Sequence, residues 1–130
     1  MKSGAEQARV LALKAEHDME FAELGLENNA ALDGVCFHLQ QAAEKLLKAL
    51  LCVQDQEYPL THNIQVLVDL ALPNCPELEP LRKPLAALSP YAVMRYDDIY
   101  PDREEALAAR QVVQDLRAAV HKVLPPQALP

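Results

Sequence analysis

Residues 91–102 are the most unusual stretch of the sequence. They hold three of the four tyrosines, three aspartates and one arginine, Arg95. A planar guanidinium binds phosphate through paired N–H donors, and tyrosine rings can stack on a base or act through their hydroxyls. The segment lies between two expected helices, where irregular backbone is accessible. It predicts either a phosphate-binding corner or a structural one, in which Arg95 pairs with an aspartate and the tyrosines cover the end of a bundle.

A second polar group lies within the clearest helical pattern of the chain, over residues 33–56. Apolar residues three and four apart predict its buried face: Val35, Leu39, Ala42, Leu46, Leu50 and Val53. At about 100° per residue, the polar residues His38, Gln41, Glu44, Lys45 and Lys48 gather on a different arc. Glu44 and Lys48 also form a favourable i,i+4 pair. Charged faces of this kind are usually solvated.

The elements that must position these residues are all predicted to be helices. Residues 6–26 carry two adjacent apolar stripes, and His17 completes the stripe of Val10, Leu13, Phe21 and Leu24. A buried or half-buried His17 is expected. A short helix is expected over 62–72, capped by Thr61, and a proline-broken one over 78–95. The last helix begins near Asp102, and the tail 125–130 is expected to fray.

Composition supports one soluble helical domain over residues 1–130, with a core at about 6–124. The sequence is 51% hydrophobic but only 5% aromatic, and Ala and Leu favour helices. Its net charge of −7 disfavours general nucleic-acid binding, so a nucleotide or RNA needs a local basic cluster. Three widely spaced cysteines, without C-x-x-C, predict reduced thiols and no metal site. We expect a cytoplasmic protein, because no signal peptide or membrane span is recognisable.

Three motifs together resemble the HEPN domain, a helical family named for nucleotide binding in higher eukaryotes and prokaryotes. Residues 37–51 are similar to its Q-x-x-E-K-x-x-K-A-x-L helix. Thr61-His62-Asn63-Ile64 resembles its T-H-x-L helix start. Arg95-Tyr96, followed by Pro101-Asp102, resembles the R-Y-P-D corner before the last helix, although the corner here is longer. Their order, with the first helix, covers nearly the whole chain.

The resemblance implies an all-α, antiparallel up-and-down bundle of four or five helices, often a homodimer. It also implies pairing with a minimal nucleotidyltransferase in toxin–antitoxin modules. Many relatives are metal-independent RNases in which a histidine follows the arginine closely. Arg95 matches that arginine, but Tyr100, Pro101 and Asp102 occupy the positions of the histidine. The imidazole for general acid–base catalysis is absent from its place, so catalysis is not expected and Arg95 is its only candidate.

The resulting hypothesis is a nucleotide- or RNA-phosphate-binding module that acts with a minimal nucleotidyltransferase and needs no cofactor. Its ligand is a purine nucleotide or an RNA phosphate. Arg95 would hold phosphate, Tyr96 and Tyr100 would stack or use their hydroxyls, and three residues would support them: His62, Lys45 and Lys48. Two alternatives remain open, a divergent RNase toxin with a substitute base and a purely structural interaction module. A homodimer is expected through the first or last helix, because the first carries more apolar surface than one side of a small bundle needs.

Overall fold

The structure is a computed structural model that describes residues 2–94 and 97–130. These residues form helices and turns, with no strand among them. The α-helices are α1 (Gly4–Glu27), α2 (Leu32–Val53), α3 (Ile64–Ala71), α4 (Arg82–Ala86) and α5 (Arg103–Val123). The predicted all-α antiparallel bundle is confirmed.

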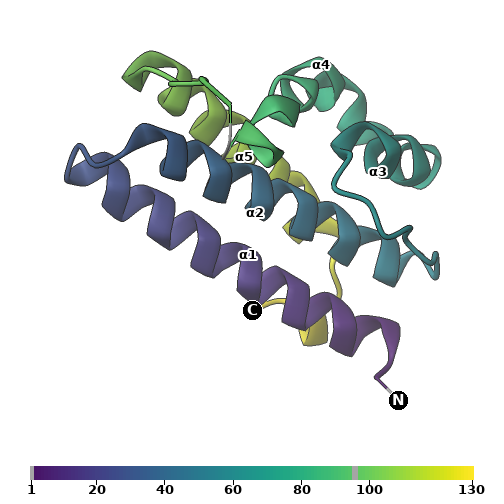
Figure 1. The fold of residues 1–130 in the computed structure, drawn as a ribbon. Helices are drawn as coiled ribbons and strands as arrows, with labels where there is room; N and C mark the ends of the chain where they lie inside the picture. Colours follow the sequence, from purple (N-terminus) through teal and green to yellow (C-terminus); the bar gives the residue numbers. More distant parts are fainter. Residues whose placement is uncertain (1, 95–96) are drawn as a thin grey trace.

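Helices α1 and α2 form an antiparallel hairpin that makes up the lower part of the molecule in Figure 1. The side chain of Ser3 caps the start of α1, and the helix ends at Glu27, with Asn28 as its C-cap and Asn29 at a positive φ of 48°. Small side chains at the seam let the two helices approach closely. At Gly25 a Cβ would lie 2.5 Å from Cγ2 of Val35, so this crossing requires glycine.

Helix α2 lies at the centre, in contact with α1, α3 and α5. Its buried positions include every residue of the predicted apolar face except Val53, which is half-buried. Helix α5 begins after a capping box in which Asp102 and Glu105 satisfy each other's backbone N–H groups. The residues that α5 buries are Ala106, Ala109, Val113, Leu116 and Val120. Helices α1, α2 and α5 therefore share one core.

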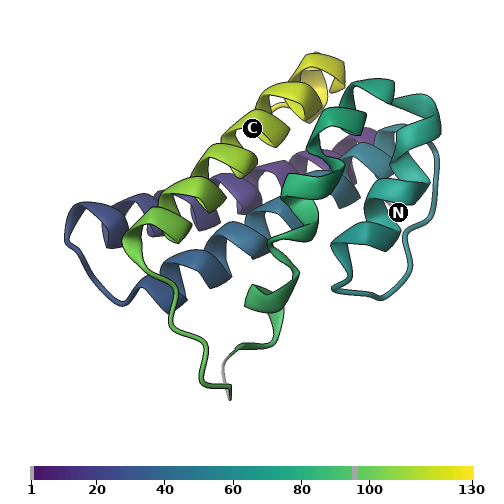
Figure 2. The same cartoon turned by 90° about the horizontal axis from the view of Figure 1, so that it is seen from above.

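The segment between α3 and α5 is broken, as its prolines predict. Pro76–Leu81 and Ser89–Ala92 are 3-10 helices, η2 and η3, on either side of the five-residue α4. Both 3-10 helices have a proline in their first two positions, where the missing N–H costs no hydrogen bond. The corner between η3 and α5 follows, and its described part protrudes from the bundle (Figure 2).

Several local expectations are wrong. Helix α3 begins at Ile64, since Asn63 and not Thr61 caps it, and His62 precedes the helix. His17 is exposed, because the alanine-rich stripe of α1 packs inward instead. The tail does not fray: Pro126–Ala128 is a 3-10 helix, η5, whose Ala128 is fully buried and which contacts α1.

Within residues 2–94 and 97–130, no helix has both the length and the hydropathy needed to cross a bilayer.

Candidate functional site

The candidate site is the polar side of α2, which lies between α1 and the connection at residues 54–63. It holds two clusters of charged side chains, and each is built on a carboxylate with little contact with solvent. In the sequence, these clusters are indicated by the predicted polar arc of the helix over residues 33–56. The expectation of a merely solvated arc is wrong, because Glu44 is only 4% exposed.

Glu44 organises the first cluster. Its Oε1 accepts a hydrogen bond from Nζ of Lys48 at 2.7 Å, which confirms the predicted i,i+4 pair. Nδ1 of His62 lies 3.1 Å from both carboxylate oxygens of Glu44. The side chains of Glu44 and Lys48 are 6% and 13% exposed, whereas that of His62 is 76% exposed. The cluster thus has a largely buried carboxylate and ammonium group, with an exposed imidazole at its rim.

Two further contacts define this rim. The ammonium of Lys48 lies 5.3 Å from the ring centroid of Tyr58, a cation–π contact with the connection. Gln40 is fully buried, and its Nε2 donates to the backbone oxygen of His62 at 3.4 Å. Nε2 of Gln41 donates in turn to Oε1 of Gln40 at 2.7 Å. These bonds from α2 hold His62 in place although it lies outside any helix.

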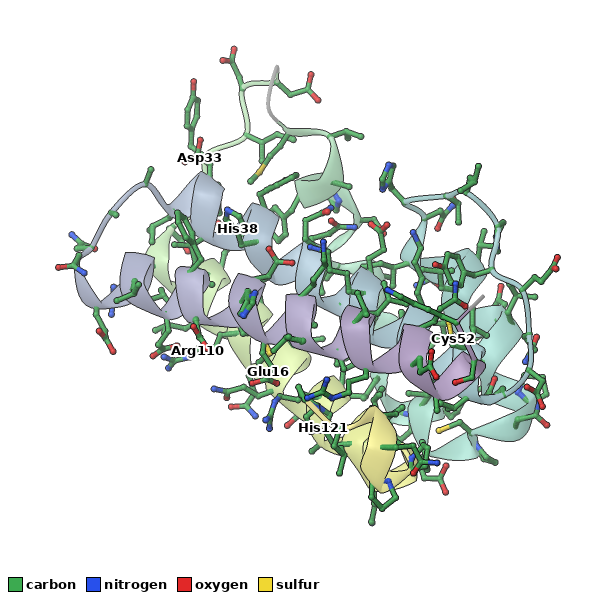
Figure 3. The ribbon with its side chains drawn as sticks, turned by 90° about the horizontal axis from the view of Figure 1, so that it is seen from below. Glu16, Asp33, His38, Cys52, Arg110 and His121 are labelled. Carbon is green, nitrogen blue, oxygen red and sulfur yellow. The ribbon has the colours of Figure 1, made fainter. Side chains whose placement is uncertain are left out.

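Asp18 of α1 organises the second cluster. Its Oδ2 accepts from Nζ of Lys45 at 2.5 Å, and its Oδ1 lies 2.9 Å from Nδ1 of His38. The side chain of Asp18 is 12% exposed, and those of Lys45 and His38 are 28% and 29% exposed. The ring of Phe21 covers the imidazole, with centroids 4.4 Å apart. Figure 3 shows His38 on the edge of α2 beside α1.

The charges of both clusters are arranged alike. Each has one carboxylate that contacts one ammonium group and one imidazole. Ordered imidazoles and ammonium groups of this kind are hydrogen-bond donors to phosphate. Among residues 2–94 and 97–130, no three His, Cys, Asp or Glu side chains form a group that could hold a metal ion.

The corner before α5 contributes one described residue of the predicted site. Tyr100 is 78% exposed, and its hydroxyl donates to Oδ1 of Asp98 at 3.4 Å. Arg95 and Tyr96 lie outside the described residues. Figure 3 shows the described part of the corner beyond the edge of α2 at which α2 begins, near Asp33.

The ends of the corner are structural. Tyr91 is buried, and its hydroxyl is a neighbour of the Cys36 thiol of α2. Burial, followed by the neighbouring Cys36, raises the pKa of Tyr91 to about 12. Asp102 caps α5. The chemistry of the corner is therefore confined to the residues between these two anchors.

The structure thus brings only part of the predicted site together. Lys48 and His62 meet on Glu44, whereas Lys45 belongs to the separate cluster of Asp18. The prediction did not include Asp18, Glu44 or His38 among the site residues. The signal for Asp18 was present in the sequence, since it continues the spacing of the buried Ala15 and Ala22 and so places a charge on a buried face.

The comparisons agree with this fold. The family model described as HEPN domain matches residues 8–123. Among solved structures, the chain is similar to one described as TT1696 from Thermus thermophilus, with a TM-score of 0.79 and 28% identity. The similarity covers 89% of this chain and 97% of that one. No curated protein matches the chain.

Proposed function

The chain belongs to the HEPN domain family, and on that premise we propose that it binds the phosphate of a purine nucleotide or an RNA at the polar side of α2 and the neighbouring corner. In this proposal it works in the cytoplasm with a minimal nucleotidyltransferase, as half of a two-component, toxin–antitoxin-like system. Its three cysteines are free thiols, in keeping with a reducing compartment.

The observation that carries the proposal is the contact of His62 with Glu44. A carboxylate on Nδ1 fixes the orientation and the tautomer of an imidazole. Nδ1 of His62 is occupied in this way, and three-quarters of the side chain is exposed. Its Nε2 is therefore the ring nitrogen left to donate to a phosphate oxygen when the imidazole is protonated. A chain of net charge −7 does not attract polyanions through its overall charge, so phosphate binding requires local donors of this kind.

The remaining residues have supporting roles. Lys48 shares Glu44 with His62, so its ammonium is fixed at the same rim. Lys45 is held by Asp18 one turn of α2 before Lys48. In the proposal, Arg95 grips the phosphate as a planar fork, and the exposed ring of Tyr100 stacks on a base, as Tyr96 does.

The second candidate function is the divergent RNase. The observation that favours it is the same contact of His62 with Glu44, because many general bases are histidines that a carboxylate orients. His62 would then be the substitute for the histidine that the sequence lacks at positions 100–102. Cleavage of RNA that is lost in His62→Ala would support this candidate.

Titration with fluorescent purine nucleotides and a short single-stranded RNA tests the binding proposal. We expect His62→Ala and Lys48→Gln each to weaken binding about tenfold, the loss of one charge-assisted hydrogen bond. Lys83→Gln, at an exposed lysine of α4, is the matched control and should bind as the wild type does. Unchanged binding in both His62→Ala and Lys48→Gln would contradict the proposed site, and absence of binding by the wild type would leave the structural interaction module as the function.

The partner is tested separately. If the neighbouring gene encodes a small nucleotidyltransferase, the two proteins should copurify after coexpression. Copurification that survives His62→Ala would show that partner and ligand occupy different surfaces. A nucleotidyltransferase that stays unbound at micromolar concentration would contradict the two-component proposal.

A further inference from the structure

Two adjacent glutamines of α2 form a chain of hydrogen bonds that ends at the surface. Gln40 is fully buried, and its Nε2 donates to the backbone oxygen of His62 at 3.4 Å. Nε2 of Gln41 donates in turn to Oε1 of Gln40 at 2.7 Å. Gln41 is half-buried and lies on the polar arc that also holds Lys45 and Lys48, which are half-buried as well. The chain of hydrogen bonds therefore joins the backbone of His62 to an amide on the polar side of α2.

These hydrogen bonds fix which way both amides face. If the amide of Gln40 were turned over, its oxygen would meet the backbone oxygen of His62, and two acceptors would be in contact at a fully buried side chain. With Gln40 fixed, Gln41 must present its nitrogen to Oε1 of Gln40. Within residues 2–94 and 97–130, the second N–H and the Oε1 of Gln41 have no hydrogen-bond partner. Gln41 therefore offers one donor beside one acceptor in a fixed orientation.

Gln41 lies between the two parts of the proposed phosphate site. Along the axis of α2 it is about 10 Å from Lys48 and about 12 Å from Asp33, near which the described part of the corner lies (Figure 3). The chain of hydrogen bonds sets a closer limit, because Nε2 of Gln41 can be no more than about 9 Å from the backbone oxygen of His62. A single nucleoside monophosphate can extend over such a distance, with its phosphate at one end and the edge of its base at the other.

We propose that Gln41 recognises the base of the bound nucleotide and that Gln40 positions it. This role rests on the proposed phosphate site and narrows the class of ligand that the site takes. A free N–H beside a free oxygen pairs with a base edge that has an acceptor beside a donor. Adenine has its N6 amine beside a ring nitrogen, and guanine has its N1–H beside O6. The ligand is therefore a purine nucleotide whose base carries an N–H donor, and not a sugar phosphate alone.

Calorimetric titration with matched ligands tests whether the base is recognised. AMP, GMP and purine riboside 5′-monophosphate share ribose and phosphate, but the base of the third has no N–H. We expect the wild type to bind the better of AMP and GMP about tenfold more tightly than purine riboside 5′-monophosphate, since one hydrogen bond is lost. The comparison of AMP with GMP shows which base supplies the edge. Equal binding of all three would overturn the proposal.

Gln41→Leu tests whether this residue causes the preference. The variant lacks both the donor and the acceptor, so we expect it to bind the three nucleotides alike. Its affinity for ribose 5-phosphate should equal that of the wild type, because His62 and Lys48 are unchanged. Gln111→Leu, the same substitution at an exposed glutamine of α5, is the control and should keep the wild-type preference. A preference that survives Gln41→Leu would overturn the proposal.

Gln40→Leu tests the positioning role. Leucine suits a fully buried helical position, and water can reach the backbone of the exposed His62, so we expect the variant to unfold in urea at a similar midpoint. The amide of Gln41 can then turn, and the preference for the N–H-bearing base should fall several-fold because the pre-organisation is lost. A stable Gln40→Leu variant with the full preference would contradict the positioning role.

The same titrations separate failure of this role from failure of the phosphate site. A wild type that binds none of the three nucleotides and no ribose 5-phosphate would contradict the phosphate site, and recognition of the base with it. A wild type that binds ribose 5-phosphate as tightly as AMP and GMP would contradict recognition of the base alone. We expect ribose 5-phosphate to bind more weakly than AMP or GMP in the wild type and equally in Gln41→Leu and the wild type.

Discussion

Nδ1 of His62 lies 3.1 Å from each carboxylate oxygen of Glu44, and Nζ of Lys48 lies 2.7 Å from one of them. One buried acid therefore holds two potential phosphate donors. A purely solvated face would not bury its carboxylate, because an ionised group is removed from water only where partners compensate it.

Replacing this acid should cost stability as well as binding. Glu44→Gln leaves the ammonium of Lys48 without its anion at a site where it is 13% exposed, and we expect a loss of about 2–4 kcal/mol in the free energy of unfolding. Urea denaturation measures it. The control is Glu57→Gln at an exposed glutamate of the connection, which should change stability by less than about 0.5 kcal/mol. Equal effects in the two variants would show that the buried position of Glu44 has no special importance.

Acidification should destabilise the protein through His121. Burial, followed by the nearby Arg117 charge, lowers the pKa of His121 below its usual value, and its Nε2 is buried without a hydrogen-bond partner. The unfolded histidine, with a pKa of about 6.5, takes up its proton first. Stability is therefore lost as the pH falls below about 6.5 toward the lowered pKa. Denaturation at pH 7.5 and 5.5 should show a smaller loss for His121→Gln. Equal losses would contradict the assignment.

The thiols should be unreactive in the folded protein. Burial raises the pKa of Cys36 and of Cys75 to about 11, and both are at most 1% exposed. Because the thiolate is the reactive form, alkylation at pH 8 should be at least about a hundredfold slower than in urea. Mass spectrometry of iodoacetamide adducts over time measures the rates. Rapid labelling of the native protein at Cys36 would contradict its burial against Tyr91.

Periodicity predicted the helices well because it reports which residues face inward over several turns. It could not choose between the two stripes of α1, since both fit a helix. Packing decides that choice: the alanines at 8, 12, 15 and 22 allow close contact with neighbouring helices, so His17 and its stripe face outward. The start of α3 was misplaced because Asn63, rather than Thr61, bonds the first free N–H group.

The site was harder to predict than the fold. Lys45 and Asp18 are 27 positions apart, and His62 and Glu44 are 18 apart, so no local spacing indicates either contact. From the sequence alone, replacing Lys45 and Lys48 is expected to cost little stability. Because both are tied to carboxylates that are at most 12% exposed, their replacement by Gln should now lower stability as well as binding.

Comparison of the wild type with Arg95→Ala tests whether the chain binds phosphate without cleaving RNA efficiently. Both proteins are titrated with purine nucleotide and RNA and assayed for RNA cleavage. We expect the wild type to bind and Arg95→Ala to lose binding. We expect no cleavage above background by either protein, since a missing general acid–base imidazole typically costs about 10²–10⁴-fold in rate. Robust wild-type cleavage that disappears with Arg95→Ala would contradict it, as would binding that is the same in both proteins.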